Sequence, residues 1–339
     1  MNKVLYYILY VLFYMISLLP YRVLYVISDI ILYPVIFHLT SYRRKITRAN
    51  LSHAYPDKTQ EERDEIEKKF YHFFCDYFLE TIKLISVSKK ELKRRMVMKG
   101  TDDMYKSFEK NTMLFIYLGH FCNWEYIASL QWWMPDDVLC SQIYRILRNK
   151  PFDMLFYKIR SRFGGLNMEK NSSMRAIMEQ KRKGQKTIVG FIADQGPRWI
   201  NIHLFTPFLR QDTAVFTGTE RIARKVGASV YVAHLTRPRR GYYECEYKCL
   251  TLDVRNDFAE NELTKCYIHD LEQQIDANPH LWLWTHKRWR RQRTDEDAPE
   301  EWKATLQDGI PISETPIKKS ESLSPSRTCK SSQQRKDAQ

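Results

Sequence analysis

The stretch TMLFIYL at residues 112–118 carries no charged side chain, and GHFCNWE follows it at residues 119–125. A short apolar run of this kind is typical of a strand that is buried on both faces of a sheet. Three further apolar runs have the same character, at residues 138–143, 187–193 and 229–235. Because parallel sheets are covered on both faces, four such strands predict a mostly parallel sheet.

Helical segments separate these strands, and we expect them at residues 124–133, 151–163, 173–183 and 217–226. This alternation predicts an α/β fold with a mostly parallel central sheet flanked by helices. Residues 242–254 alternate polar and apolar side chains, which favours an edge strand. A further helix is expected at residues 261–275.

A long helix is expected before the sheet. Thr59-Gln60-Glu61-Glu62 has the form of a capping box, in which the first and last side chains satisfy the helix N-terminus. Apolar side chains then recur at helical spacing from Ile66 to Ile85. This periodicity predicts a helix that packs one face inward.

The chain begins with a strongly apolar segment. No charged residue occurs from Val4 to Tyr21, and eighteen helical residues would be about 27 Å long, just short of a bilayer core. A second apolar run, Val23 to Phe37, is interrupted by Asp29 and Pro34. A membrane span, interfacial helices and buried core helices all fit this pattern. A cleaved signal peptide does not, because residues 18–22 lack a small-residue cleavage site.

The chain is also basic and aromatic, with a net charge of +14, a pI of about 9.3 and 14% aromatic residues among 339. This composition fits either nucleic acid or an anionic membrane surface as partner. No helix-turn-helix or RNP motif occurs, and nucleic-acid binding would leave the apolar start unexplained. We therefore expect no nucleic acid and predict membrane or anion contacts from Arg43, Arg44, Lys45, Arg48, Lys287 and Arg288.

The seven cysteines lack the spacing of a disulfide framework or a zinc site. We expect free thiols in a reducing compartment and no bound metal.

The chemistry is expected where the strand at residues 112–118 ends, because ligands of open α/β sheets bind at the carboxyl ends of strands. His120 and Glu125 lie there, and a turn between them, with Asn123 as helix N-cap, would bring the two side chains together. A carboxylate beside an imidazole fixes its tautomer and stabilises the imidazolium. The pair therefore predicts a general base that activates a substrate hydroxyl directly. Cys122 has no second base assigned to it.

These residues resemble the Gly-His-x-Gly-Asn-Trp-Glu block of the late lipid A acyltransferase family, in the lysophospholipid acyltransferase superfamily. Cys122 stands where that block has its second glycine, and a Cβ there disfavours a positive φ. In residues 144–149, Ile146 stands where the family usually has proline. The resemblance extends from about residue 4 to residue 293, with further matching blocks at residues 48–56, 144–149, 193–195, 206–228 and 284–289.

The resemblance implies transfer of an acyl chain from acyl carrier protein, or occasionally coenzyme A, to a hydroxyl of a membrane glycolipid without a cofactor. In that reaction His120 would be the base and Glu125 would orient it. Arg145 would hold acceptor phosphate or the developing oxyanion. The resemblance also places Asn123, Asp194 and Gln195 among the substrate-binding residues.

We accordingly expect three parts: a membrane anchor at residues 1–38, an acyltransferase domain at residues 39–296 and a polar, disordered tail at residues 297–339. The basic residues after the anchor would keep the catalytic domain on the cytoplasmic face of the inner membrane. The sequence leaves open an aminolipid or lysophospholipid as the acceptor. Acyl length, the acylated hydroxyl, the oligomeric state and whether Val4–Tyr21 spans or lies in the interface also stay open.

Overall fold

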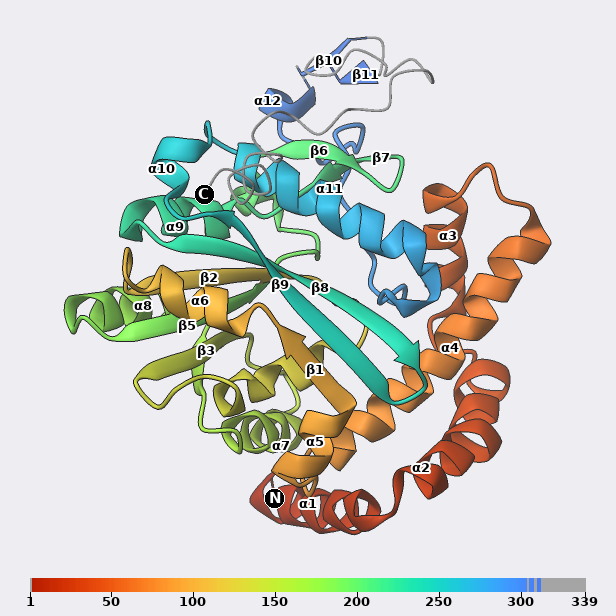
Figure 1. The fold of residues 1–339 in the computed structure, drawn as a ribbon. Coiled ribbons are helices and arrows are strands. Elements are labelled where there is room, and N and C mark those ends of the chain that lie inside the picture. Colours follow the sequence, from red (N-terminus) through yellow and green to blue (C-terminus); the bar gives the residue numbers. More distant parts are fainter. Residues whose placement is uncertain (1, 304, 308–309, 312–339) are drawn as a thin grey trace.

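The computed structural model describes residues 2–303, 305–307 and 310–311, and its centre is a seven-stranded sheet (Figure 1). The strand order is β1-β9-β8-β2-β5-β3-β4. Neighbours from β8 to β4 are parallel, whereas β9 is antiparallel to β8 and β1 is parallel to β9. The strands of this sheet are β1 (Met96–Lys99), β2 (Met113–Leu118), β3 (Val138–Tyr144), β4 (Leu166–Glu169), β5 (Lys186–Ile192), β8 (Ser229–Arg239) and β9 (Tyr242–Thr251).

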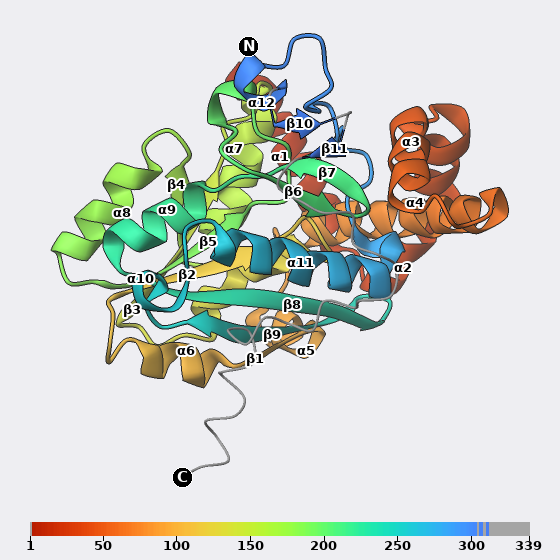
Figure 2. The ribbon, with the colours of Figure 1, turned by 90° about the horizontal axis from the view of Figure 1, so that it is seen from above.

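Helices cover both faces of this sheet. Figure 2 shows α9 and α11 on one face and α5 and α6 on the other. The α-helices are α1 (Asn2–Leu18), α2 (Tyr21–Ile27), α3 (Arg44–Ala54), α4 (Gln60–Lys83), α5 (Lys89–Arg95), α6 (Thr101–Ser107), α7 (Lys150–Ser161), α8 (Ser173–Arg182), α9 (Gly218–Val226), α10 (Val254–Asp257), α11 (Glu262–Ala277) and α12 (Glu300–Lys303). Shorter helical segments of other types are η1 (Ser28–Leu32), η2 (Pro34–Leu39), η3 (Trp124–Trp132), η4 (Trp199–Asn201) and η5 (Pro279–Leu281).

The predicted α/β fold with a mostly parallel sheet is confirmed. The four apolar runs form β2, β3, β5 and β8, and every residue of β2 is buried. The capping box at α4 is also confirmed: the Thr59 hydroxyl accepts from the Glu62 main-chain N–H at 3.3 Å, and the Glu62 carboxylate accepts from the Thr59 N–H at 2.7 Å.

The expectation that residues 242–254 form an edge strand is wrong. The strand β9 lies between β8 and β1, so the short strand β1 is the edge. Alternating burial along β9 reflects one exposed and one packed face, which an internal strand can also have. The sequence of β1, MVMK, has only four residues and follows a basic helix directly. An alternation this short does not indicate a strand.

The apolar start does not form one helix over Val4–Tyr21. The helix α1 ends at Leu18, and Pro20 precedes α2, which continues through η1 and η2 to Leu39. Among the described residues, the helical segment Tyr21–Leu39 is the one long and apolar enough to cross a membrane by length and composition, and Lys3–Leu18 is shorter. Both segments pack on α4, and α1 also packs on α7.

Beyond residue 296 the structure describes α12 and a small hairpin of β10 (Leu306–Gln307) and β11 (Ile310–Pro311). Trp302 of α12 packs on Phe205, with ring centroids 5.0 Å apart. Phe205 belongs to a second small hairpin, made of β6 (Phe205–Phe208) and β7 (Gln211–Ala214). Residues 312–339 of the predicted tail lie outside the described residues, and the predicted boundaries at 38 and 296 stay predictions.

Candidate active site

His120 lies immediately after β2, and Asp194 lies two residues after the neighbouring strand β5. The imidazole Nδ1 is 2.7 Å from Asp194 Oδ1, and the His120 main-chain N–H donates to Asp194 Oδ2 at 2.9 Å. Trp282 Nε1 donates to the same Oδ2 at 2.8 Å. The Asp194 carboxylate therefore contacts three N–H groups, those of the His120 imidazole, the His120 main chain and the Trp282 indole, which fix it beside the imidazole.

The Asp194 side chain is buried, which by itself would raise the pKa of its carboxyl group. The charge and hydrogen bonds of His120, with the Trp282 donor, outweigh burial and lower this pKa to about 2. The ionised Asp194 carboxylate accepts a hydrogen bond from Nδ1–H, and this assignment leaves the lone pair of the neutral imidazole on Nε2. The Nε2 atom is then available as a base, and Gln195 Nε2 lies 3.3 Å from it.

Trp282 reaches this position because the closing segment of the chain runs beside residues 120–122. Phe121 and Trp282 form an isolated β-bridge, the Leu283 N–H donates to the His120 carbonyl at 3.0 Å, and the Cys122 N–H donates to the Leu281 carbonyl at 2.8 Å. These contacts hold Trp282, about 160 positions after His120 in the sequence, against the Asp194 carboxylate.

The predicted pairing of Glu125 with His120 is wrong. Glu125 is buried and binds Arg160 of α7 in a bidentate pair, with Oε1 2.6 Å from Nη2 and Oε2 3.0 Å from Nε. The 3-10 helix η3 begins at Trp124 and directs Glu125 toward α7. The Trp124 ring lies against His120, with centroids 5.1 Å apart, so Glu125 lies close to the site without contacting the His120 imidazole.

Arg160 should stabilise the fold through this pair. Replacing Arg160 with methionine leaves the buried Glu125 carboxylate without its cation, and we expect the free energy of unfolding to fall by about 3 kcal/mol. Urea denaturation measures this change. The double variant E125Q/R160M removes the buried charge and should recover most of the loss, so equal unfolding midpoints for R160M and the double variant would contradict the assignment.

Asn123 caps η3 as expected, since its Oδ1 accepts from the Tyr126 N–H at 3.3 Å. Its side-chain amide also donates to Glu80 Oε2 at 2.7 Å, and the residue is fully buried. The predicted substrate-binding role of Asn123 is therefore wrong, because its polar atoms are committed to the fold.

Cys122 adopts the left-handed conformation with φ 56° and is fully buried. The turn between β2 and η3 thus keeps the backbone that a glycine would adopt freely, despite the added Cβ. Cysteine fills the space with a small thiol at the cost of this backbone strain.

Valine at position 122 should be poorly tolerated, because a β-branched residue at positive φ is a rare outlier. We expect C122V to lower the free energy of unfolding by at least about 2 kcal/mol. C122G removes the strain but also a buried side chain, and should change stability by no more than about 1 kcal/mol. Chemical denaturation of both variants tests this, and a C122V protein as stable as C122G would contradict it.

Arg145 follows β3 and is exposed, at the same edge of the sheet as His120 and Asp194. It lies near Lys170, whose pKa is lowered by burial and by the charges of Arg145 and Arg198. Sequence reasoning missed Lys170 and Arg198, which follow β4 and β5 and complete a group of three cations. Their shared position at the carboxyl ends of neighbouring strands was the available signal.

The six predicted membrane or anion contacts divide by exposure. Arg288 is 2% exposed and donates to the Ala214 carbonyl at 2.9 Å, so a membrane contact from it is wrong. Arg44 and Arg48 both bind the buried Glu67, at 3.0 and 3.1 Å. The side chains of Arg43, Lys45, Arg48 and Lys287 are exposed, although Arg43 also donates to the Thr285 carbonyl at 3.1 Å.

Comparison with known proteins gives a consistent result. A family model described as bacterial lipid A biosynthesis acyltransferase matches residues 2–291. A lipid A biosynthesis acyltransferase of Haemophilus influenzae is 21% identical over 264 residues, which are 77% of this chain and 80% of that protein.

Proposed function

This chain belongs to the bacterial lipid A biosynthesis acyltransferase family, and we propose that it transfers a fatty acyl chain from the thioester of acyl carrier protein to a hydroxyl of a lipid A precursor. The transfer would take place at the cytoplasmic face of the inner membrane. The observation that carries the proposal is the His120–Asp194 pair at the end of β2, with Nε2 directed away from its carboxylate partner.

In the proposed reaction, His120 Nε2 takes the proton of the acceptor hydroxyl, and the hydroxyl oxygen attacks the thioester carbonyl. Asp194 keeps the proton on Nδ1 and stabilises the imidazolium. When the tetrahedral intermediate collapses, the C–S bond breaks and the imidazolium proton passes to the departing thiolate. The products are an ester and the free thiol of the carrier, so the reaction needs no cofactor beyond the thioester.

Gln195 would act at the same nitrogen. Its amide lies 3.3 Å from His120 Nε2, in the place that the acceptor hydroxyl must take. Displaced by the acceptor, this amide N–H can donate to the oxygen of the tetrahedral intermediate, where developing negative charge needs a donor.

The three cations Arg145, Lys170 and Arg198 would hold a phosphate of the acceptor. Arg145 follows β3, Lys170 follows β4 and Arg198 follows β5, and burial together with the charges of Arg145 and Arg198 lowers the pKa of Lys170. A phosphate would relieve that repulsion, and the planar guanidinium groups can bind it through two hydrogen bonds each.

The direct test incubates the purified chain with acyl carrier protein charged with defined fatty acids and a lipid A precursor, and analyses the lipid by mass spectrometry. We expect a gain of one acyl mass on the precursor, and the same difference between lipid A from cells with and without the gene. Acylation of an aminolipid or lysophospholipid, with none of the precursor, would replace the proposed acceptor. No acyl gain on any lipid would overturn the proposal.

A further inference from the structure

The first two helical segments each have one packed side and one outward apolar side. The packed side of α1 includes Phe13, whose ring lies 6.3 Å from those of Phe78 in α4 and Phe152 in α7. The outward side of α1 exposes Val4, Leu5, Tyr7, Ile8, Val11, Leu12, Tyr14, Met15 and Leu18. The outward side of the segment from α2 to η2 exposes Val23, Val26, Ile30, Ile31, Val35 and Leu39. These side chains form an apolar face much larger than scattered surface residues would give.

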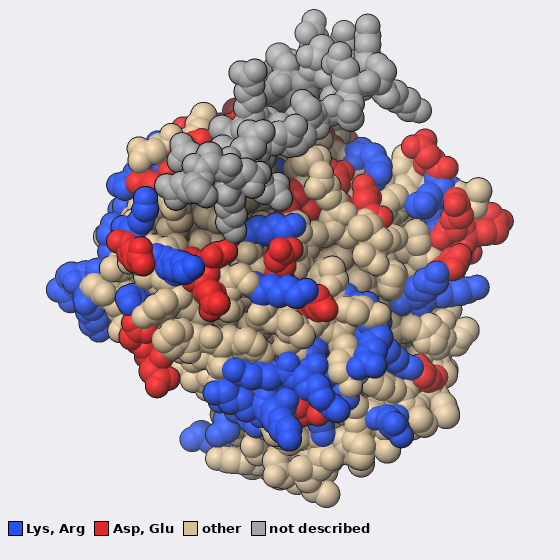
Figure 3. All heavy atoms as spheres, in the orientation of Figure 1, with Lys and Arg blue, Asp and Glu red and all other residues tan. Residues whose placement is uncertain are grey.

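A basic surface borders this apolar face. Figure 3 shows Lys and Arg gathered where Figure 1 places α5 and the end of the β8–β9 hairpin, directly above the mostly uncharged surface of α1. Glu91 of α5 pairs with Arg94 and Arg95 and offsets only one positive charge, so this surface keeps an excess of cations. The exposed cations of this basic surface are Arg22, Lys89, Lys90, Lys93, Arg94 and Arg239.

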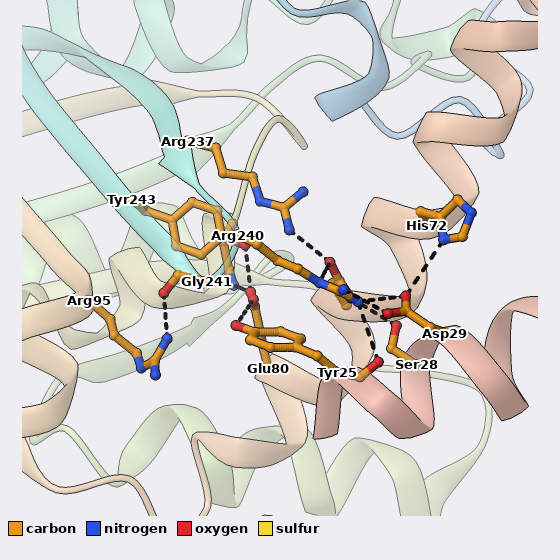
Figure 4. Close-up of polar contacts among 12 residues, drawn as sticks. Tyr25, Ser28, Asp29, His72, Glu80, Arg95, Arg237, Arg240, Gly241 and Tyr243 are labelled. Carbon is orange, nitrogen blue, oxygen red and sulfur yellow. Dashed lines mark hydrogen bonds and ion pairs between the residues drawn. The ribbon is translucent and has the colours of Figure 1, made fainter. Parts of the chain in front are cut away.

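The second segment is fastened to the catalytic domain by ion pairs, shown in Figure 4. Arg240 of the hairpin end binds Asp29 of η1 at 2.7 Å and the buried Asp76 of α4 at 2.6 Å. Ser28 donates to the same Asp76 at 2.8 Å, and Arg237 binds it at 2.7 Å. We call this group of five residues the clamp.

Next to the clamp, Tyr25 of α2 donates to Glu80 of α4 at 2.9 Å, and Tyr243 of β9 donates to the other oxygen at 2.6 Å. Glu80 is buried, so the tyrosine hydroxyls supply the hydrogen bonds that its carboxylate requires. Helices α2 and η1 are therefore tied at successive turns to both α4 and the hairpin.

The clamp decides between the two ways in which Tyr21–Leu39 can meet a membrane. As a span, this segment would carry Asp29 and Ser28 into hydrocarbon and leave the buried Asp76 with fewer partners, both of which are unfavourable. Lying along the domain, it keeps every clamp contact and still turns its apolar side outward. The lying arrangement is thus the one that the described contacts support.

We propose that α1, the segment from α2 to η2 and the basic surface together dock on one leaflet of an anionic phospholipid membrane, and that Tyr21–Leu39 does not cross it. The apolar side chains enter the acyl region while the cations bind phosphate head groups. A bilayer is favoured over an acidic protein because the cations continue directly into lipid-like apolar surface. The inference extends the proposed function by placing the enzyme on its membrane, and its tests use no acyl transfer.

The first test measures flotation of the full chain with vesicles of phosphatidylethanolamine and phosphatidylglycerol. The variant K89Q/K90Q/K93Q should bind these vesicles about 100-fold more weakly, the loss of about 3 kcal/mol expected for three cations at an anionic surface. The matched control R182Q/K183Q/K225Q removes the same charge from the C-terminal end of α8 and from α9 and should bind like the wild type.

Equal loss in both variants would mean that net charge alone drives binding and would overturn the proposal. Unchanged vesicle binding by the α5 variant, with weakened binding to acyl carrier protein, would make the basic surface a protein site and would also overturn it. Circular dichroism and thermal unfolding of each variant establish that the fold is kept.

The second test addresses crossing. Pro20 and Thr40 lie at the two ends of the Tyr21–Leu39 segment and are both exposed. In vesicle-bound protein, a membrane-impermeant maleimide should label P20C and T40C from the same side, above the background of the parent chain. Labelling of the two cysteines from opposite sides would show a span and overturn the one-leaflet arrangement.

Discussion

Replacing His120 with alanine should lower the acyl-transfer rate by about 10²–10⁴-fold, the range for loss of a general base. The imidazole is the only part of the proposed mechanism that takes the hydroxyl proton, and its side chain is 20% exposed. Its removal leaves Asp194 with the Trp282 indole and the main-chain N–H as donors, so the fold should survive. Initial rates with purified acyl carrier protein thioester measure the effect.

The matched control for this prediction is H203A, which removes an exposed histidine outside the site and should leave the rate unchanged. Thermal unfolding of both variants should stay close to that of the wild type. Near-normal turnover by a folded H120A protein would exclude His120 as the base.

Most of the fold could be predicted because its signals are local. The strand β2 is buried on both faces, so its sequence contains no charged residue. The start of α4 is marked by the capping box of Thr59 and Glu62. The strand β1 has no such signal, since four residues of strand contribute little pattern. The break after Leu18 does have a local signal in Pro20, since helices usually end at or before the residue preceding a proline, but the continuous apolar character of the run conceals it.

The site was predicted less completely, because it joins residues that are distant in sequence. Spacing suggested Glu125 as partner of His120, but the direction of a side chain after a turn depends on the helix type that follows. Asp194 is the partner because β2 and β5 are parallel neighbours and therefore end at the same edge of the sheet. Only the pairing of the two strands determines this, and the local sequence does not give that pairing. Exposure is similarly nonlocal: Lys287 is exposed and its neighbour Arg288 is buried.

Replacing Asp194 with asparagine should lower the acyl-transfer rate by about 10²–10⁴-fold, nearly as much as replacing His120. The reason is that the substitution changes which nitrogen of His120 carries the proton. Asp194 Oδ2 accepts two N–H groups, from the His120 main chain and from Trp282. An asparagine satisfies both only by placing its oxygen there, which turns its NH₂ toward His120 Nδ1. A donor facing Nδ1 favours the tautomer with the proton on Nε2, and that nitrogen then cannot accept a proton from the acceptor hydroxyl.

The matched control is D270N, which makes the same change in a second aspartate–histidine pair, between Asp270 of α11 and His234 of β8. D270N should keep wild-type turnover if only the pair at β2 serves the reaction. Steady-state rates separate the outcomes, since loss of tautomer control lowers kcat while leaving a folded protein with intact binding. A folded D194N enzyme with wild-type kcat would show that the carboxylate does not set the protonation state of His120, and the proposed pair would fail as the catalytic unit.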